Sequence, residues 1–512
     1  MKICKPLAGS AIFLTLTGST AAFADVTAQQ VWADWNDYMN GFGYHVSAQE
    51  STSGDTLTIK DFSASMTLPE DGGDMKMRLP TLQFRNRGDG TVSVRMPQHN
   101  PVVINVTPKD GDPTKIALDY FQTGLSMIVS GTPDEMTYAT TATEIGLKLT
   151  GLTAGGQKVS VDGTGNNSLS ASLTAGNFLG NYVARIGDLR QMDSTSSIGS
   201  VSYELSGIDP SGNGVFNFKG SLEDLKSTST GAFPAGVDFN NMAAVLNAGF
   251  AIAGDFAYGA GHSIFDVKDG SKTTSGTTAS QGGGLTFAID KTQLHYGASS
   301  NQAEISITSS DIPFPSLTLK MAEVAADLAI PVAKSDAPQD FSFLIKLRDF
   351  ALPDELWGMA DPTGVLPHDP ATLVLDLSGK ANWLVDIFDP KQQAQMGDKA
   401  PGKIESLTLK DLQARAAGAD LTGTGSFTFD NNDLQSFGGM PKPTGAIDLK
   451  LVGGNTLLDN LVKMGLMPED QATGMRMMTG MFAKPGDGDD TLVSKVEITE
   501  DGQILANGQR LK

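Results

Sequence analysis

The sequence predicts a mainly β protein of the α+β class, in which long, curved antiparallel sheets of meander topology carry a few helices on one face. Segments that alternate apolar and polar residues recur about every ten residues, with turn residues between them. Thr91–Met96 is one such segment, and the turn Arg87–Gly90 before it is typical of a hairpin. The chain has 512 residues, which is enough to bury a large core.

The N-terminus has the pattern of a secretory signal. Lys2 and Lys5 precede the apolar stretch Leu7–Thr20, and Ala22-Phe23-Ala24 places small residues where a signal peptidase reads them. The apolar stretch is short for a transmembrane helix. We therefore expect residues 1–24 to be a signal peptide cleaved after Ala24, and the mature protein to reach the periplasm.

Cysteine content and net charge exclude several kinds of site and partner. The one cysteine, Cys4, lies within the predicted signal, so the mature chain is cysteine-free and has neither disulfides nor thiolate sites. The net charge of −21 opposes binding to nucleic acid. No later apolar run reaches the roughly 20 residues of a membrane-spanning helix. We expect an acidic, soluble product without a transmembrane segment.

Residues 25–267 are predicted to form an N-terminal β-rich part with helices. A helix should begin at Asp25 or Thr27 and pack on a sheet through Trp32 and Trp35. Strand patterns follow, and two further helices are predicted at Phe178–Met192 and Met242–Tyr258. Residues 268–284 are rich in Gly, Ser and Thr and predict an exposed loop, which is either a domain linker or a long hairpin.

Residues 285–512 are predicted to form a C-terminal β-rich part. Phe341–Leu347 and Thr372–Leu377 alternate as strands around an insert rich in Pro and Asp. Within this insert we expect a short helix at Leu352–Met359, whose Leu356 and Trp357 fill the sheet. A methionine-rich helical pair follows after Asn455.

No catalytic motif is recognisable in the chain. The five histidines stand singly in the sequence, at His45, His99, His262, His295 and His368. None has the spacing of a zinc ligand set. His368 precedes Asp369, but Asp-Pro dipeptides of this kind are typical of turns. The sequence therefore predicts a protein that is not an enzyme, with no catalytic residues, cofactor or metal.

The methionines of the helical pair are the candidate binding residues. They could pack on the sheet, or they could line an adaptable apolar groove. A copper(I) site is a third interpretation, which lacks support from a nearby His or Cys. The candidate groove residues are Met464, Met467, Met475, Met478, Met481 and Phe482.

Three stretches resemble an uncharacterised bacterial family, the domain of unknown function DUF2125. They read QVWADWNDYMNGFGY, FALPDELWGMADPTGVLPHDPATLVLDLSGKANWLVDIFDP and LTGTGSFTFDNNDLQSFGGMPKPTGAIDLKLVGG, and they spread over nearly the whole mature chain. This resemblance implies no activity and no site residues. The G-x-G-x-F-x-F-D pattern is also loosely similar to AsmA-type envelope proteins. That similarity implies an elongated β-rich protein associated with lipid movement or outer-membrane upkeep.

These observations favour a periplasmic protein that binds a lipid or another apolar molecule in a groove between sheet and helix. The alternative is a structural or adaptor protein of the cell envelope that has no ligand.

Overall fold

The computed structural model describes residues 26–68, 73–108, 111–209, 213–237, 241–396 and 400–511. The predicted signal peptide and its cleavage after Ala24 lie outside these residues. The structure is 63% strand and 12% helix, which confirms the mainly β, α+β class. The chain divides into two compact units. The first contains residues 1–277 and 309–311, and the second contains residues 278–308 and 312–512.

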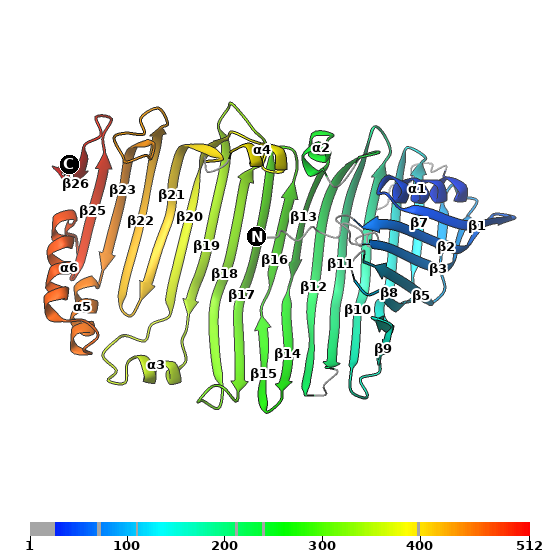
Figure 1. The fold of residues 1–512 in the computed structure, drawn as a ribbon, viewed down its shortest axis with the longest axis horizontal. Coiled ribbons are helices and arrows are strands. Elements are labelled where there is room, and N and C mark those ends of the chain that lie inside the picture. Colours follow the sequence, from blue (N-terminus) through cyan, green and yellow to red (C-terminus); the bar gives the residue numbers. More distant parts are fainter. Residues whose placement is uncertain are drawn as a thin grey trace. The chain divides into compact units, whose positions relative to one another are not determined.

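The first unit begins with α1 (Ala28–Gly41), which is followed by a nine-stranded antiparallel sheet (Figure 1). The strand order is β1-β2-β3-β4-β7-β8-β6-β5, and β9 pairs with β8. The bounds are β1 (His45–Ser53), β2 (Thr56–Leu68), β3 (Gly73–Asn86), β4 (Val92–Arg95), β5 (His99–Thr107), β6 (Thr114–Thr123), β7 (Ser126–Thr132), β8 (Glu135–Ala154) and β9 (Gln157–Val159).

Long antiparallel strands complete the first unit. They are β10 (Ser168–Arg185), β11 (Leu189–Ile208), β12 (Gly214–Pro234), β13 (Ala251–Tyr258) and β14 (Ala260–Asp269), with the short helix α2 (Met242–Asn247) before β13. One half of β12 pairs with β13 and the other half pairs with β14. β15 (Lys272–Ser280) lies where the sequence passes from the first unit to the second.

The buried core of the first unit lies between α1 and the nine-stranded sheet. Thr27 caps α1 in a capping box with Gln30, and the helix then buries Val31 and Trp32. The ring centroid of Phe84 on β3 lies 5.9 Å from that of Trp32 and 5.2 Å from that of Trp35. The predicted anchoring of this helix by its two tryptophans is therefore what the structure shows.

The long strands of this unit kink at one aligned position. Asn177 on β10 and Asp224 on β12 have positive φ, and each lies opposite a glycine of the neighbouring strand. A Cβ on Gly199 would come within 3.1 Å of the Asn177 Cβ, and one on Gly259 within 3.1 Å of the Asp224 Cβ. The absent side chains make room for the kinks.

The second unit is built on a sequential antiparallel sheet of meander topology (Figure 1). Its order is β16 to β23 followed by β25, β26 and β27, and β24 pairs with β25. The bounds are β16 (Gly283–Ile289), β17 (Gln293–Ser309), β18 (Leu317–Pro331), β19 (Gln339–Phe350), β20 (Ala371–Trp383), β21 (Gly402–Ala416), β22 (Ala419–Asp430), β23 (Lys442–Val452), β24 (Lys484–Pro485), β25 (Thr491–Ile498), β26 (Ile504–Ala506) and β27 (Gln509–Arg510).

Four helices lie in the connections between the described strands of this meander. α3 (Asp354–Ala360) lies between β19 and β20, and α4 (Pro390–Met396) lies between β20 and β21. α5 (Gly454–Lys463) and α6 (Glu469–Phe482) form the helical pair between β23 and β24. The helical pair and the pairing of β19 with β20 agree with the sequence patterns.

Three predicted elements are wrong. Phe178–Met192 is not a helix but the end of β10 and the start of β11, because pairing along both strands outweighs local preference. The predicted helix Met242–Tyr258 stops at Asn247, since Gly249 takes a φ of +99° and the chain continues as β13. Residues 272–280 of the predicted loop form β15, where threonine favours an extended backbone.

Candidate functional site

One face of the second unit's sheet is apolar from strand to strand. Residues that pair directly in an antiparallel sheet point to the same face, so the pairing shows which side chains adjoin. The first cross-strand row, named row A, is Phe287, Tyr296, Leu328, Phe343, Leu377, Leu409, Gly425, Ile447, Val496 and Ala506. Row A crosses β16 to β23, β25 and β26 without a polar residue other than Tyr296.

A second row runs beside the first on the same face. Same-face residues are two apart along a strand. Row B, two residues from row A on most strands, is Leu285, Ala298, Ala326, Ile345, Leu375, Leu412, Gly423, Leu449 and Ser494. We call rows A and B together the apolar face. In the described strands, neither row contains a charged residue.

The charged residues of these strands lie on the opposite face. Lys346, which follows Ile345 of row B, binds Glu323 of β18 at 3.2 Å between Nζ and Oε1. His295 Nε2 lies 2.8 Å from Asp327 Oδ2, and both residues directly precede members of row A. The sheet is therefore amphipathic, with its ion pairs on one side and its apolar side chains on the other.

Large side chains of the apolar face are open to solvent. Tyr296 is 51% exposed, and Phe287 and Leu328, its partners in row A, are 37% and 39% exposed. Leu285 and Ile345 of row B and Leu373 on β20 are exposed to a similar degree. A soluble monomer rarely leaves such a contiguous apolar surface uncovered unless it binds something there.

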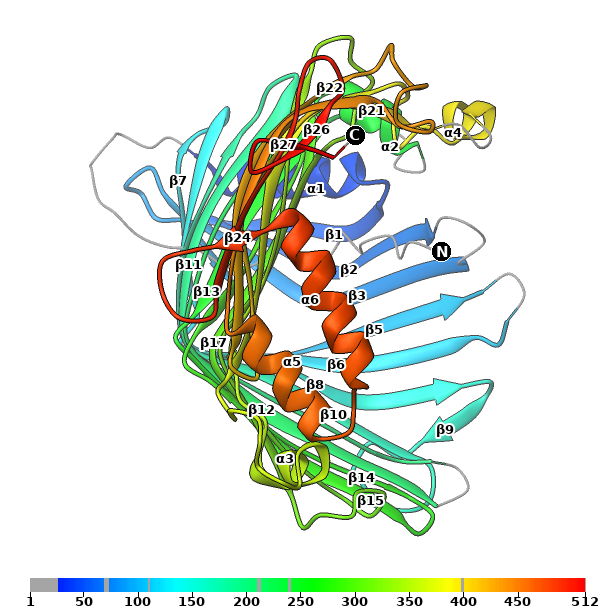
Figure 2. The same ribbon diagram turned by 90° about the vertical axis from the view of Figure 1, so that its left-hand side faces the viewer.

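The methionine-rich helix α6 borders the apolar face. Ser494, the last member of row B, donates a hydrogen bond of 2.6 Å from Oγ to the carbonyl of Phe482 at the end of α6. Figure 2 shows α5 and α6 on the inner side of the bowed strands of this unit. The helix buries Ala472 and binds Asp459 of α5 through Arg476, so its contact side is small and polar.

The predicted groove residues on α6 are exposed to solvent. Met478 is 63% exposed, and Met475, Met481 and Phe482 are also exposed, as is Met477. Met464 and Met467, before the helix, are half-buried. The methionines of α6 are therefore not packed into the sheet. The larger apolar surface next to them was missed, although its signal was the alternation of each strand.

The predicted core residues have different environments. Trp32 is buried, and Trp35 is partly buried against the same cluster. Leu356 and Trp357 on α3 are half-buried, and no described residue of α3 is fully buried. Trp357 stacks on the His368 ring at 4.3 Å between centroids. The insert is held together by such local contacts rather than by filling the sheet.

A buried ion pair fastens α1 to the long strands of the first unit. Arg190 of β11 binds Asp34 of α1 through both terminal nitrogens, and the Tyr138 hydroxyl donates to Asp34 Oδ2 at 2.7 Å. The Arg190 guanidinium also lies 4.8 Å from the Tyr38 ring centroid. Burial raises the pKa values of the Tyr38 and Tyr138 phenols above the usual 10.0. These groups stay neutral around a structural ion pair.

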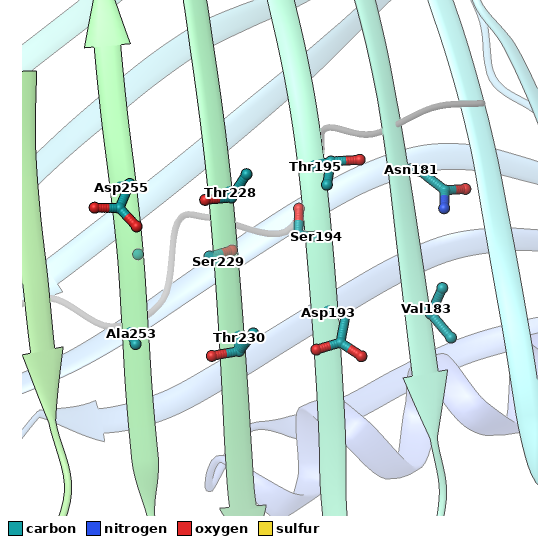
Figure 3. Close-up of a pocket in the computed structure, with 11 residues that line it drawn as sticks. Asn181, Val183, Asp193, Ser194, Thr195, Thr228, Ser229, Thr230, Ala253 and Asp255 are labelled. Atoms are coloured by element: carbon teal, nitrogen blue, oxygen red, sulfur yellow. The ribbon is translucent and has the colours of Figure 1, made fainter. Parts of the chain in front are cut away.

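The first unit has its own apolar surface and an open pocket. Leu173, Leu205 and Phe218 are exposed, and pairing places Leu205 directly beside Phe218. Elsewhere on β10 to β13, an open pocket of about 250 Å³ is lined by two cross-strand rows (Figure 3). The rows are Asn181, Thr195, Thr228 and Asp255, and Val183, Asp193, Thr230 and Ala253.

This pocket offers hydroxyls and carboxylates. Arg185 binds Asp193 at its rim. Among the described residues, no three His, Cys, Asp or Glu side chains gather as metal ligands would. Within the same residues, no helix combines the length and hydropathy needed to cross a membrane.

Comparison with known proteins adds a family but no activity. Residues 257–507 match the model of a family described as "Uncharacterized protein conserved in bacteria (DUF2125)". No curated protein and no solved structure matches the chain. The match covers the latter half of the chain, and the AsmA-type similarity is not among these findings.

Proposed function

The latter half of the chain, residues 257–507, belongs to the DUF2125 family, and we propose that this protein is an exported, non-enzymatic binding protein of the periplasm. It holds a lipid or a similar apolar molecule against the apolar face of the second unit. The observation that carries this proposal is the pair of charge-free rows A and B, which expose several large side chains on β16 to β19.

The size of the apolar face suits a lipid. Strands are spaced about 4.8 Å apart, so row A, which crosses ten strands from Phe287 to Ala506, extends over about 43 Å. The largest apolar patch on an ordinary monomer is about 300–600 Å². Burial of apolar surface stabilises a complex by about 25 cal/mol per Å², so covering even part of this face is strongly favourable.

The border with α6 extends the binding surface from sheet to helix. Phe482, at the end of the helix that carries the exposed methionines, adjoins Ser494, the last residue of row B, in space. Methionine side chains adapt their shape to varied apolar partners. The arrangement supports binding between sheet and helix, in which the sheet supplies most of the area.

A matched pair of variants on β17 tests the proposal. Tyr296 belongs to row A, whereas Ser299, also exposed, projects from the opposite face. We expect the purified protein to carry co-extracted lipid detectable by mass spectrometry and to take up a fluorescent fatty acid. Tyr296→Lys should lower both, because it places a charge among apolar groups. Ser299→Lys should leave both unchanged.

The opposite result would favour an adaptor without a ligand. A protein that carries no lipid, takes up no fatty acid and responds equally to both lysine variants contradicts the proposal. Crosslinking to another envelope protein through Tyr296 would then identify the apolar face as a protein interface.

A further inference from the structure

Side chains on the apolar face are spaced differently along the strands and across them. Same-face side chains are about 6.8 Å apart along a strand, but neighbours across strands are about 4.8 Å apart. Side chains within row A therefore touch, while rows A and B are separated by the wider spacing. The furrow between the two rows runs across the strands.

This furrow changes depth along its length. Row B has Ala298 on β17 and Ala326 on β18, and these two residues pair directly. The larger Leu285 and Ile345 stand on either side of them in the same row. Next to the two alanines, row A carries Tyr296 and Leu328. Among β16 to β19, the furrow is therefore widest across β17 and β18.

We infer that the ligand is a lipid with long, unbranched acyl chains, and that a chain lies in this furrow, across the strands, over Ala298 and Ala326. The inference rests on the proposed function and names its substrate class. A flexible chain one methylene wide follows a furrow between two rows of side chains, whereas a rigid fused-ring hydrocarbon bridges the rows and leaves the furrow empty.

The length of the furrow also fits acyl chains. One leaflet of a bilayer has a hydrocarbon depth of about 15 Å, half of the roughly 30 Å core, and this is the reach of one chain. Rows A and B run side by side over nine strands, from β16 to β25, which corresponds to about 38 Å. A single acyl chain fits within the furrow without meeting a charged residue.

Adjacent alanines on β18 provide the test. Ala326 is exposed in row B, whereas Ala325 pairs with Ser299 and points to the opposite face. Ala326→Phe fills the furrow, and Ala325→Phe adds the same ring on the other side of the sheet. Binding of saturated fatty acids of increasing length, and of a fused-ring hydrocarbon of similar size, is measured by displacement of a fluorescent fatty acid.

For the unaltered protein, we expect affinity to rise about two- to fourfold for each added methylene, since each buried methylene contributes up to about 0.8 kcal/mol. Ala326→Phe should lower the affinity for the longest fatty acid at least tenfold, and Ala325→Phe should keep the affinity of the unaltered protein. Circular dichroism checks folding, and the smaller change Ala298→Leu replaces Ala326→Phe if the latter unfolds.

A fatty acid carrying a diazirine at its end gives an independent readout. Crosslinks should fall on rows A and B of several strands, including β17 and β18. If the fused-ring compound binds as tightly as the longest fatty acid, or if Ala326→Phe and Ala298→Leu leave the length dependence intact, the inference is overturned while the proposed function stands. If no apolar compound binds, the proposed function itself fails.

Discussion

Removal of Arg190 should destabilise the first unit more than removal of any exposed cation. The Asp34 side chain is 2% exposed and that of Arg190 is 14% exposed, so Arg190→Met leaves a carboxylate in the interior, next to the Tyr138 hydroxyl, without its cation. Breaking a buried ion pair in this way costs about 3–5 kcal/mol. The contact with the Tyr38 ring is lost as well.

The control is an exposed ion pair of the same unit. Lys272 Nζ lies 2.9 Å from Asp311 Oδ2, and the two side chains are 66% and 57% exposed. Lys272→Met should cost less than about 1 kcal/mol. Urea unfolding, monitored by circular dichroism and by the fluorescence of tryptophans such as Trp32 in the core of the first unit, measures the unfolding free energy of each variant.

The double variant Asp34→Leu/Arg190→Met separates the ion pair from the packing. It removes both charges from the interior, so it should recover most of the stability lost in Arg190→Met. The reasoning is refuted if Arg190→Met costs no more than Lys272→Met, or if the double variant is less stable than Arg190→Met.

Three further predictions concern glycine positions, pH and export. Gly445→Ala should unfold the second unit, because the new Cβ would lie 2.0 Å from the Ser426 carbonyl oxygen. Gly474→Ala in α6 places its Cβ in open space and should stabilise the helix by about 1 kcal/mol. Thermal melting temperatures of the two variants test this difference. Burial raises the pKa of the Tyr120 phenol to about 12. Since unfolded tyrosine ionises near pH 10, this contribution to stability is complete below pH 10 and is lost as the pH rises to about 12, so the unfolding free energy relative to Tyr120→Phe should fall over that window. N-terminal sequencing of the exported protein should begin at Asp25, and a chain that retains Met1 would contradict the predicted cleavage.

Local patterns were sufficient for the elements whose partners are close in sequence. The cap of α1, the helical pair α5 and α6, and the strands β19 and β20 were predictable from the sequence because helix caps and alternation are local properties. The segments 178–192 and 251–258 were wrongly predicted to be helical. Their apolar residues suit either structure, and pairing with the neighbouring strands β11 and β12 decided for β.

The candidate site was likewise predicted only in part from the sequence. The exposed methionines of α6 were found from composition, and whether they bind a ligand stays a prediction. The alternation of each strand was visible, but an alternating strand says only that one face is apolar. It does not say which strands adjoin or what covers that face.

The sequence by itself determined the mainly β class, the methionine-rich helical pair and the absence of a recognisable catalytic motif, because these depend on residue types and short spacings. Only the tertiary structure decided that apolar residues from nine strands, between Leu285 and Val496, stand in two adjoining rows, whose exposed large side chains lie on β16 to β19. Cross-strand register and burial are properties of the assembled sheet, since they depend on every neighbouring strand at once.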